Sequence, residues 1–141
     1  MTLLTHLASG VLLSKALSLD LTNSVFICIG SICPDIIEMF VAGKNWKKFF
    51  EIHRKIFHWW ILYICLFIIN FIQYKYFYIT YSIINYILYG CFLHLSLDLL
   101  TPSGIPFFSP NGPKIKIPLC KTGSYREFVV FSIFFILFFV L

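Results

Sequence analysis

Five long apolar segments, separated by polar connections, set the pattern of this chain. They predict helices over residues 3–19, 21–37, 57–72, 76–100 and 125–141. Several are shorter than the ~20 residues that a full membrane span needs, so we expect some to be tilted or packed within a bundle. The pattern therefore predicts an all-α fold, a multi-pass membrane bundle of about five helices that forms one domain over residues 1–141.

The composition also indicates a membrane protein. Hydrophobic residues make up 60% of the chain and charged residues 12%, whereas soluble domains contain about 45–50% and 25%. The N-terminal segment lacks the basic start and the cleavage site of a removable signal peptide, so we expect it to stay in the mature protein. The five cysteines show no CxxC spacing and are interpreted as small buried apolar residues.

The basic residues predict the orientation of the helices. Nine of the eleven Lys and Arg residues lie in or beside the connections 43–56 and 101–124. Five alternating spans put both connections on one side, and the positive-inside rule places that side and the N-terminus in the cytoplasm. We interpret the net charge of +5 as a topology signal and a hold on anionic membrane lipids. We expect no nucleic-acid partner.

The same topology brings most ionisable side chains of the helices to the cytoplasmic side. A bare charge in the middle of a membrane helix costs about 2.5–3.5 kcal/mol, so such a grouping requires partner charges or a metal. Asp20 alone among the acidic residues is expected at the opposite end. The converging residues are His6, Asp35, His53, His58, His94, Asp98 and Glu127, with Glu38 and Glu51 further cytoplasmic carboxylates.

Spacing adds detail to this predicted site. His94 and Asp98 are four residues apart and share a helix face, as a metal-binding pair must. Gly10 shares a face with His6 and allows a backbone or a ligand to approach closely. His53 and His58 can reach one centre only if a helix begins between them. Imidazole and carboxylate donors without a thiolate suit a divalent ion, Zn²⁺ first and Mn²⁺ second.

Structural interpretations stay open beside the metal site. His94 and Asp98 could satisfy each other as a buried pair, and Asp35 after Pro34 could simply end a helix. Glu127 with Ser124 fits a capping box at the start of the last helix. The three tryptophans are typical of an interfacial belt; they are Trp46, Trp59 and Trp60.

Five motifs resemble the YdjM family: THLASG (5–10), GSICPDIIE (30–38), HRKIFH (53–58), HLSLDLLTPSGIPFFSP (94–110) and TGSYRE (122–127). The resemblance covers nearly the whole chain. The family consists of inner-membrane proteins described as metal-dependent hydrolases and associated with the LexA-regulated damage response. It is grouped with zinc-dependent phospholipase C and P1 nuclease, which are all-helical phosphoesterases.

The resemblance implies a set of metal ligands. The chain departs from the family pattern at Ile37, where the family commonly has an acidic residue, and at Phe57, where it commonly has Thr or Ser. Glu38, which follows Ile37, and Glu127 are further candidate ligands. The implied ligands are His6, Asp35, His94 and Asp98, joined by one or both of His53 and His58.

The sequence thus predicts a membrane-bound, metal-dependent hydrolase that cuts a lipid or lipid-linked phosphoester at the cytoplasmic face of the inner membrane. Asp35 would act as general base or bridge metals, and Arg54 would pair with the substrate phosphate. The alternative is a non-enzymatic membrane protein whose His/Asp cluster is structural and which acts by binding a partner. An ion-permeation role ranks last, because no polar trail leads to the other face.

Overall fold

The computed structural model describes residues 1–74 and 78–140, and the expected all-α class is confirmed there apart from one two-residue strand pair. β1 and β2 pair antiparallel, with Ile105 opposite Ile115. The elements are α1 (Leu3–Ala16), α2 (Leu21–Ala42), α3 (Trp46–Ile52), the 3₁₀ turn η1 (Ile56–His58), α4 (Trp60–Gln73), α5 (Tyr78–Leu99), β1 (Ile105–Pro106), β2 (Lys114–Ile115) and α6 (Tyr125–Val140).

Several helices differ in extent from the sequence prediction. The first ends at Ala16, not at residue 19. The second does not end at residue 37 but continues through Pro34 to Ala42, because an internal proline removes only one helix hydrogen bond and α2 stays packed against α5. The basic connection contains α3, which begins where the Asn45 side chain accepts a hydrogen bond from the Lys48 N–H at 3.0 Å. The helix expected from residue 57 begins at Trp60, after η1. Residues 75–77 and 141, including Lys75, lie outside the described residues.

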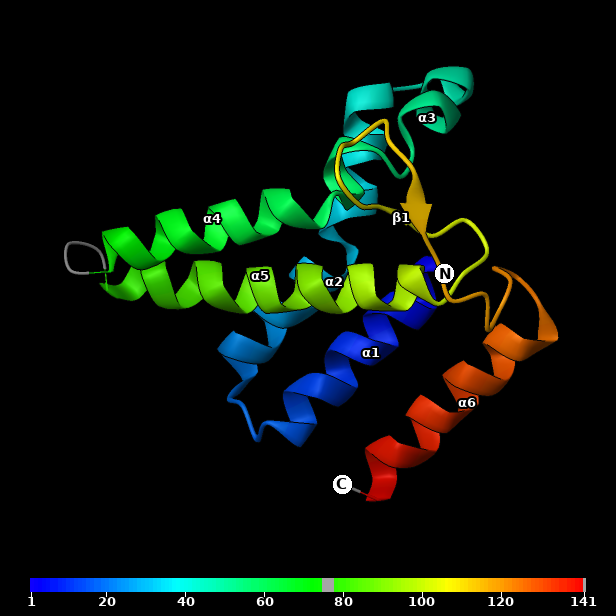
Figure 1. The fold of residues 1–141 in the computed structure, drawn as a ribbon. Helices are drawn as coiled ribbons and strands as arrows, with labels where there is room; N and C mark the ends of the chain where they lie inside the picture. The colour runs from blue at the N-terminus through cyan, green and yellow to red at the C-terminus, as the bar shows by residue number, and fades with distance from the viewer. Residues whose placement is uncertain (75–77, 141) are drawn as a thin grey trace.

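The two longest helices, α2 and α5, meet at a pair of glycines. A Cβ added to Gly30 would lie 2.0 Å from the Ile87 carbonyl oxygen, and one added to Gly90 would lie 2.2 Å from the Ile27 carbonyl oxygen. The backbones therefore touch, as only glycine permits. One to two turns beyond this crossing, each helix presents its ionisable residues at the same end of the molecule, where the N-terminus and β1 lie in Figure 1.

The other helices surround this pair. Gly10 lets α1 approach α2, since a Cβ there would lie 2.9 Å from Ser31 Oγ and 3.3 Å from Cys28 Cα. α4 packs beside α5, and α6 packs against α1 (Figure 1). Tyr63 and Leu95 belong to the main apolar cluster.

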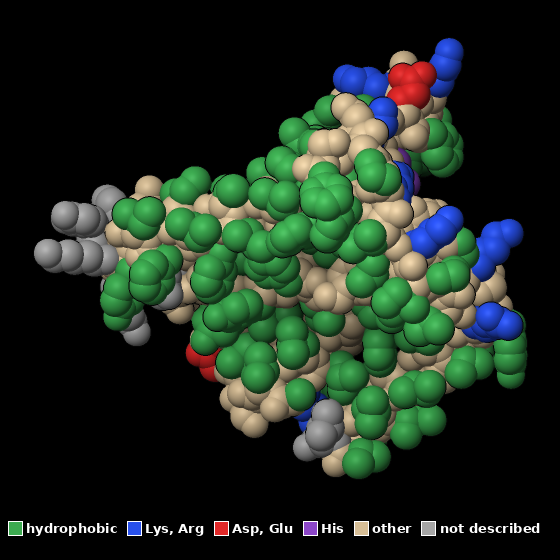
Figure 2. All heavy atoms as spheres, viewed as in Figure 1, with side chains coloured by type: hydrophobic (Ala, Val, Ile, Leu, Met, Phe, Trp, Pro, Cys, Tyr) green, Lys and Arg blue, Asp and Glu red, His purple; other side chains and the backbone are tan. Residues whose placement is uncertain are grey.

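The outer surface suits a membrane protein. Figure 2 shows apolar side chains over the helices, while the visible Lys and Arg side chains gather mainly at the end that carries α3 and the 101–124 connection. Among the described helices, α2 and the 82–99 part of α5 are long and apolar enough to cross a membrane, and α1 and α4 are shorter apolar helices.

Candidate metal centre

A buried polar layer lies where α2 and α5 pass their glycine crossing. It also receives the N-terminal part of α1 and the turn between α3 and α4. His6, His58, His94 and Glu38 are fully buried. The structure places the six residues that the sequence proposed as ligands, and Glu38 with them, in two adjoining groups. One group is Asp35, Glu38, His53 and His58, and the other is His6, His94 and Asp98. His58 joins the two groups through its contacts with His94 and Asp98.

Two histidines of this layer, His58 and His94, face each other through their Nε2 atoms, which in the neutral rings can only accept hydrogen bonds. His94 Nδ1 lies 2.8 Å from the Ser31 carbonyl oxygen, so it donates and leaves Nε2 with a lone pair in the neutral ring. His58 Nδ1 lies 2.9 Å from Glu38 Oε1 and donates in the same way. The two Nε2 atoms are 3.1 Å apart. Two facing lone pairs at this distance require a positive charge between them, either a proton or a metal ion.

Two carboxylates surround the same point. Asp35 Oδ1 lies 3.3 Å from His58 Nε2 and 3.8 Å from His94 Nε2. Asp98 Oδ2 lies 3.4 Å and 3.8 Å from the same two atoms. Tetrahedral zinc with bonds of 2.0–2.2 Å would place its donor atoms about 3.3 to 3.6 Å apart. The distances of each carboxylate oxygen from the two Nε2 atoms, 3.3–3.8 Å, are therefore close to the spacing of ligands around one divalent ion.

Without a metal, a proton supplies this charge. Burial opposes the charged form of His58, but its bonds to Asp35, Asp98 and Glu38 outweigh burial and raise its pKa to about 10. The His58 ring is then protonated at neutral pH. A metal ion at the centre would take the place of this proton.

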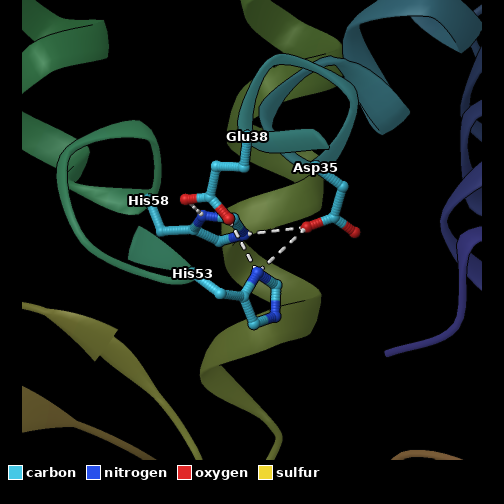
Figure 3. A group of neighbouring side chains, drawn as sticks. All are labelled: Asp35, Glu38, His53 and His58. Carbon is cyan, nitrogen blue, oxygen red and sulfur yellow. Dashed lines mark hydrogen bonds and ion pairs between the residues drawn. The ribbon is translucent and has the colours of Figure 1, made fainter. Parts of the chain in front are cut away.

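The carboxylate of Glu38 accepts several hydrogen bonds, and none of them comes from the facing Nε2 atoms of His58 and His94. The carboxylate accepts from His58 Nδ1 and from His53 Nδ1 at 2.7 Å (Figure 3). It also accepts from the Arg54 backbone N–H at 3.2 Å. Arg54 adopts a φ of +59°, so the chain turns sharply between the two histidines. α4 begins only after both histidines, so the expected helix start between them is not found there. The turn at Arg54 and the short turn η1 bring both rings to Glu38 instead. Glu38 thus orients His58 and His53.

Arg54 points into the protein. Its buried guanidinium donates to Asp98 Oδ1 at 3.0 Å and to Thr101 Oγ1 at 2.5 Å. The Met1 amine also lies 2.5 Å from Asp98 Oδ1. These cations neutralise one oxygen of Asp98 and leave Oδ2 facing the two histidines. The role of Arg54 with a substrate phosphate stays a prediction.

His6 has a fully buried imidazole ring. Its ring stacks on His94 with centroids 3.8 Å apart, and its Nε2 lies 3.4 Å from Asp98 Oδ1 without hydrogen-bond geometry. Among the described residues, neither ring nitrogen of His6 has a hydrogen-bond partner, and neither does Asp35 Oδ1. A buried polar atom left unpaired costs about 1–3 kcal/mol. Unpaired atoms that face this layer fit a site built for a metal.

Glu127 lies apart from these groups and does not form the expected capping box. Its carboxylate accepts from the Gly123 N–H at 2.6 Å, the Thr2 N–H at 2.5 Å and the Thr5 hydroxyl at 2.9 Å. Ser124 Oγ has no partner within the described residues. The Thr2 and Gly123 amides, brought together by the fold, satisfy Glu127 in place of Ser124. Glu127 joins the start of α1 to the start of α6.

The 101–124 connection is fixed beside the polar layer. The indole N–H groups of Trp59 and Trp60 donate to the Phe107 carbonyl oxygen at 3.1 and 3.0 Å. Sequence reasoning missed this contact and the Ser31 carbonyl, since backbone acceptors leave no signal in a sequence. Sequence reasoning also gave no role to Thr101, although Thr101 follows His94 and Asp98 in the motif HLSLDLLTPSGIPFFSP.

A family model described as YdjM inner membrane protein matches residues 1–141. No match was found among curated proteins or solved structures.

Proposed function

The chain belongs to the YdjM inner membrane protein family, and we propose that its polar layer is a divalent-metal centre that hydrolyses a phosphoester. The observation that carries this proposal is the pair of facing Nε2 atoms of His58 and His94, 3.1 Å apart and flanked by two carboxylates. Zinc suits these donors best, and manganese is the alternative.

His58, His94 and Asp98 would hold the ion. Two imidazoles and one carboxylate are a donor set of catalytic zinc sites, which keep one further position open. His6, stacked on His94 beside Asp98, would be an additional ligand. A bound divalent ion supplies Lewis acidity, which makes water a stronger nucleophile and neutralises charge on a phosphoryl oxygen.

Asp35 is the proposed general base. Its side chain is 15% exposed and that of His53 is 28% exposed, whereas the three proposed ligands are buried. The layer is therefore open toward solvent on the side of Asp35 and His53. From this side the Asp35 carboxylate would accept a proton from the attacking water.

The substrate would be a lipid or a lipid-linked phosphoester. Phe108, beside the anchored Phe107, is 73% exposed, and Lys114 and Lys116 are exposed on the same connection. Aromatic and basic side chains together favour the headgroup layer of a membrane. In this proposal Arg54 would hold Asp98 in place through its buried guanidinium.

The catalytic proposal includes a topology of five spans, α1, α2, α4, α5 and α6, with the metal centre facing the cytoplasm. α1, α4 and α6 would cross by tilting or by local thinning of the bilayer. Cysteines introduced at Lys47 and Lys114 in a variant without the native cysteines should react with an impermeant thiol reagent only from the cytoplasmic side. A cysteine at Lys75 should react from the other side, and cytoplasmic labelling of it would contradict the topology.

Asp35→Asn tests the catalytic role. We expect this variant to retain the metal while hydrolysis of phospholipid or phosphodiester substrates falls about 100-fold or more. If the metal-loaded wild type hydrolyses no phosphoester, the enzymatic proposal is wrong.

A second candidate function is structural, and the approach of Asp35 Oδ1 to both histidine Nε2 atoms, at 3.3 and 3.8 Å, supports it. Asp35 would then be a fourth ligand that closes the site, as in structural metal centres. In that case Asp35→Asn loses the metal and stability together. The protein would then act by binding a partner.

A further inference from the structure

Large apolar side chains are left uncovered where α2 ends and α3 begins. Trp46 and Phe50 lie one turn apart on α3 and are 67% and 71% exposed. Phe40, in the last turns of α2, is 81% exposed. The ring of Phe49 contacts both Trp46 and Phe50 and also stacks on His53, with centroids 5.0 Å apart. One side of α3 thus faces the metal centre, and an apolar side faces outward.

A hollow of about 410 Å³ lies between these two helices. Gly43 turns the chain here with a φ of +61°, and no atom lies within 4 Å of the position that a Cβ would take. The residues that line the hollow are mostly apolar, and one of them is a lysine. The lining residues are Met39, Gly43, Lys44, Trp46 and Phe49.

The charge around the hollow is positive. Lys44, Lys47 and Lys48 are exposed, and Glu51 is the acidic residue of α3. Within residues 1–74 and 78–140, none of these three lysines forms an ion pair. Figure 2 shows Lys and Arg side chains gathered with apolar ones near α3. An occupant that fits both features is itself apolar in one part and anionic in another.

We propose that this hollow binds an acidic phospholipid of the surrounding leaflet, with its phosphate at Lys44 and its glycerol and first acyl carbons against Met39 and Trp46. α2 is long and apolar enough to span a membrane and ends at Ala42, so α3 begins at the level of the headgroups. Tryptophan and short amphipathic helices with lysines favour that level, and lysines there attract anionic lipids. The proposal does not depend on metal binding or hydrolysis.

Lipid binding to the detergent-purified full chain tests this site. Native mass spectrometry would count bound phosphatidylglycerol and phosphatidylcholine for the wild type, Lys44→Ser and Lys47→Ser. The Lys47 variant is the matched control, because it also removes one positive charge, but from a residue of α3 that does not line the hollow. Far-UV circular dichroism and size-exclusion chromatography of the same samples show that the variants are folded.

We expect the wild type to prefer phosphatidylglycerol, and Lys44→Ser to weaken its binding about fivefold more than Lys47→Ser does. Equal weakening in the two variants would mean that only diffuse charge attracts the lipid, and would overturn the proposed site. The absence of any preference for phosphatidylglycerol over phosphatidylcholine in the wild type would overturn it as well.

Discussion

Glu38 Oε1 accepts a hydrogen bond from His58 Nδ1 at 2.9 Å, so the carboxylate of α2 fixes which nitrogen of His58 faces the polar layer. Metal-binding histidines commonly donate their second ring nitrogen to a carboxylate in this way, and the carboxylate sets the ring orientation and raises its basicity. Glu38 holds His53 through its other oxygen. In this account Glu38 supports the metal ligands and is not one itself.

Removing this support should weaken metal binding. Glu38→Ala should lower zinc affinity about 10–100-fold, as loss of such partners does elsewhere. Glu38→Gln should lose less, because its amide oxygen can still accept from His58. Competition with a chromogenic chelator measures both, and Glu51→Gln on exposed α3 is the control. Unchanged affinity in Glu38→Ala would contradict the role given to Glu38.

Metal binding should release protons. The pKa of His58, raised to about 10 in the metal-free protein, means that its ring carries a proton through the neutral range. Zinc must displace that proton, so affinity should rise about tenfold per pH unit up to that pKa. Chelator competition at pH 6, 7 and 8 checks the slope, and a pH-independent affinity would contradict a proton held at this position.

The same pKa predicts how the metal-free protein responds to alkali. A pKa raised on folding contributes stability that is complete below the unfolded value of about 6.5 and is lost as the pH rises toward 10. Thermal unfolding in detergent with a chelator present should therefore show a lower Tm at pH 9 than at pH 6.5. His58→Gln should flatten this dependence.

The glycine crossing should be sensitive to a single methyl group. Gly90→Ala would place a Cβ 2.2 Å from the Ile27 carbonyl oxygen and 2.6 Å from the Ser31 amide, so α2 and α5 must separate. Overpacking of this kind costs about 1–3 kcal/mol or more. We expect a lower Tm and lower metal occupancy than in Val25→Ala, which changes an exposed position of α2. Equal effects in the two variants would contradict the close crossing.

The ends of the apolar segments were harder to predict than their existence. Runs of large apolar residues define the helices directly, but Pro34 and Asp35 look like a helix end while α2 continues. The free energy lost with one helix hydrogen bond is small compared with the free energy gained by packing α2 on α5. The Gly30–Gly90 contact depends on the crossing geometry of two helices, which spacing along one chain does not contain.

The sequence was enough to predict which residues lie at the site, but not the role of each one. Alternating helices were enough to bring His6, Asp35, His94 and Asp98 to one end, and the structure brings them together. The difference between ligand and supporting residue depends on which atom faces which. That is why Glu38 was only a candidate ligand from sequence, and why the hydrogen bonds of Arg54 to Asp98 and Thr101 were not predicted.

The central claim is that the His58–His94 pair encloses a metal ion, and metal content tests it most directly. Elemental mass spectrometry of the detergent-purified wild type should find about one zinc or manganese ion per chain. His94→Ala and Asp98→Ala should lose it, while Glu51→Gln keeps it. A wild type that stays metal-free after incubation with zinc and manganese would contradict the account and leave the polar layer as a protonated, structural network.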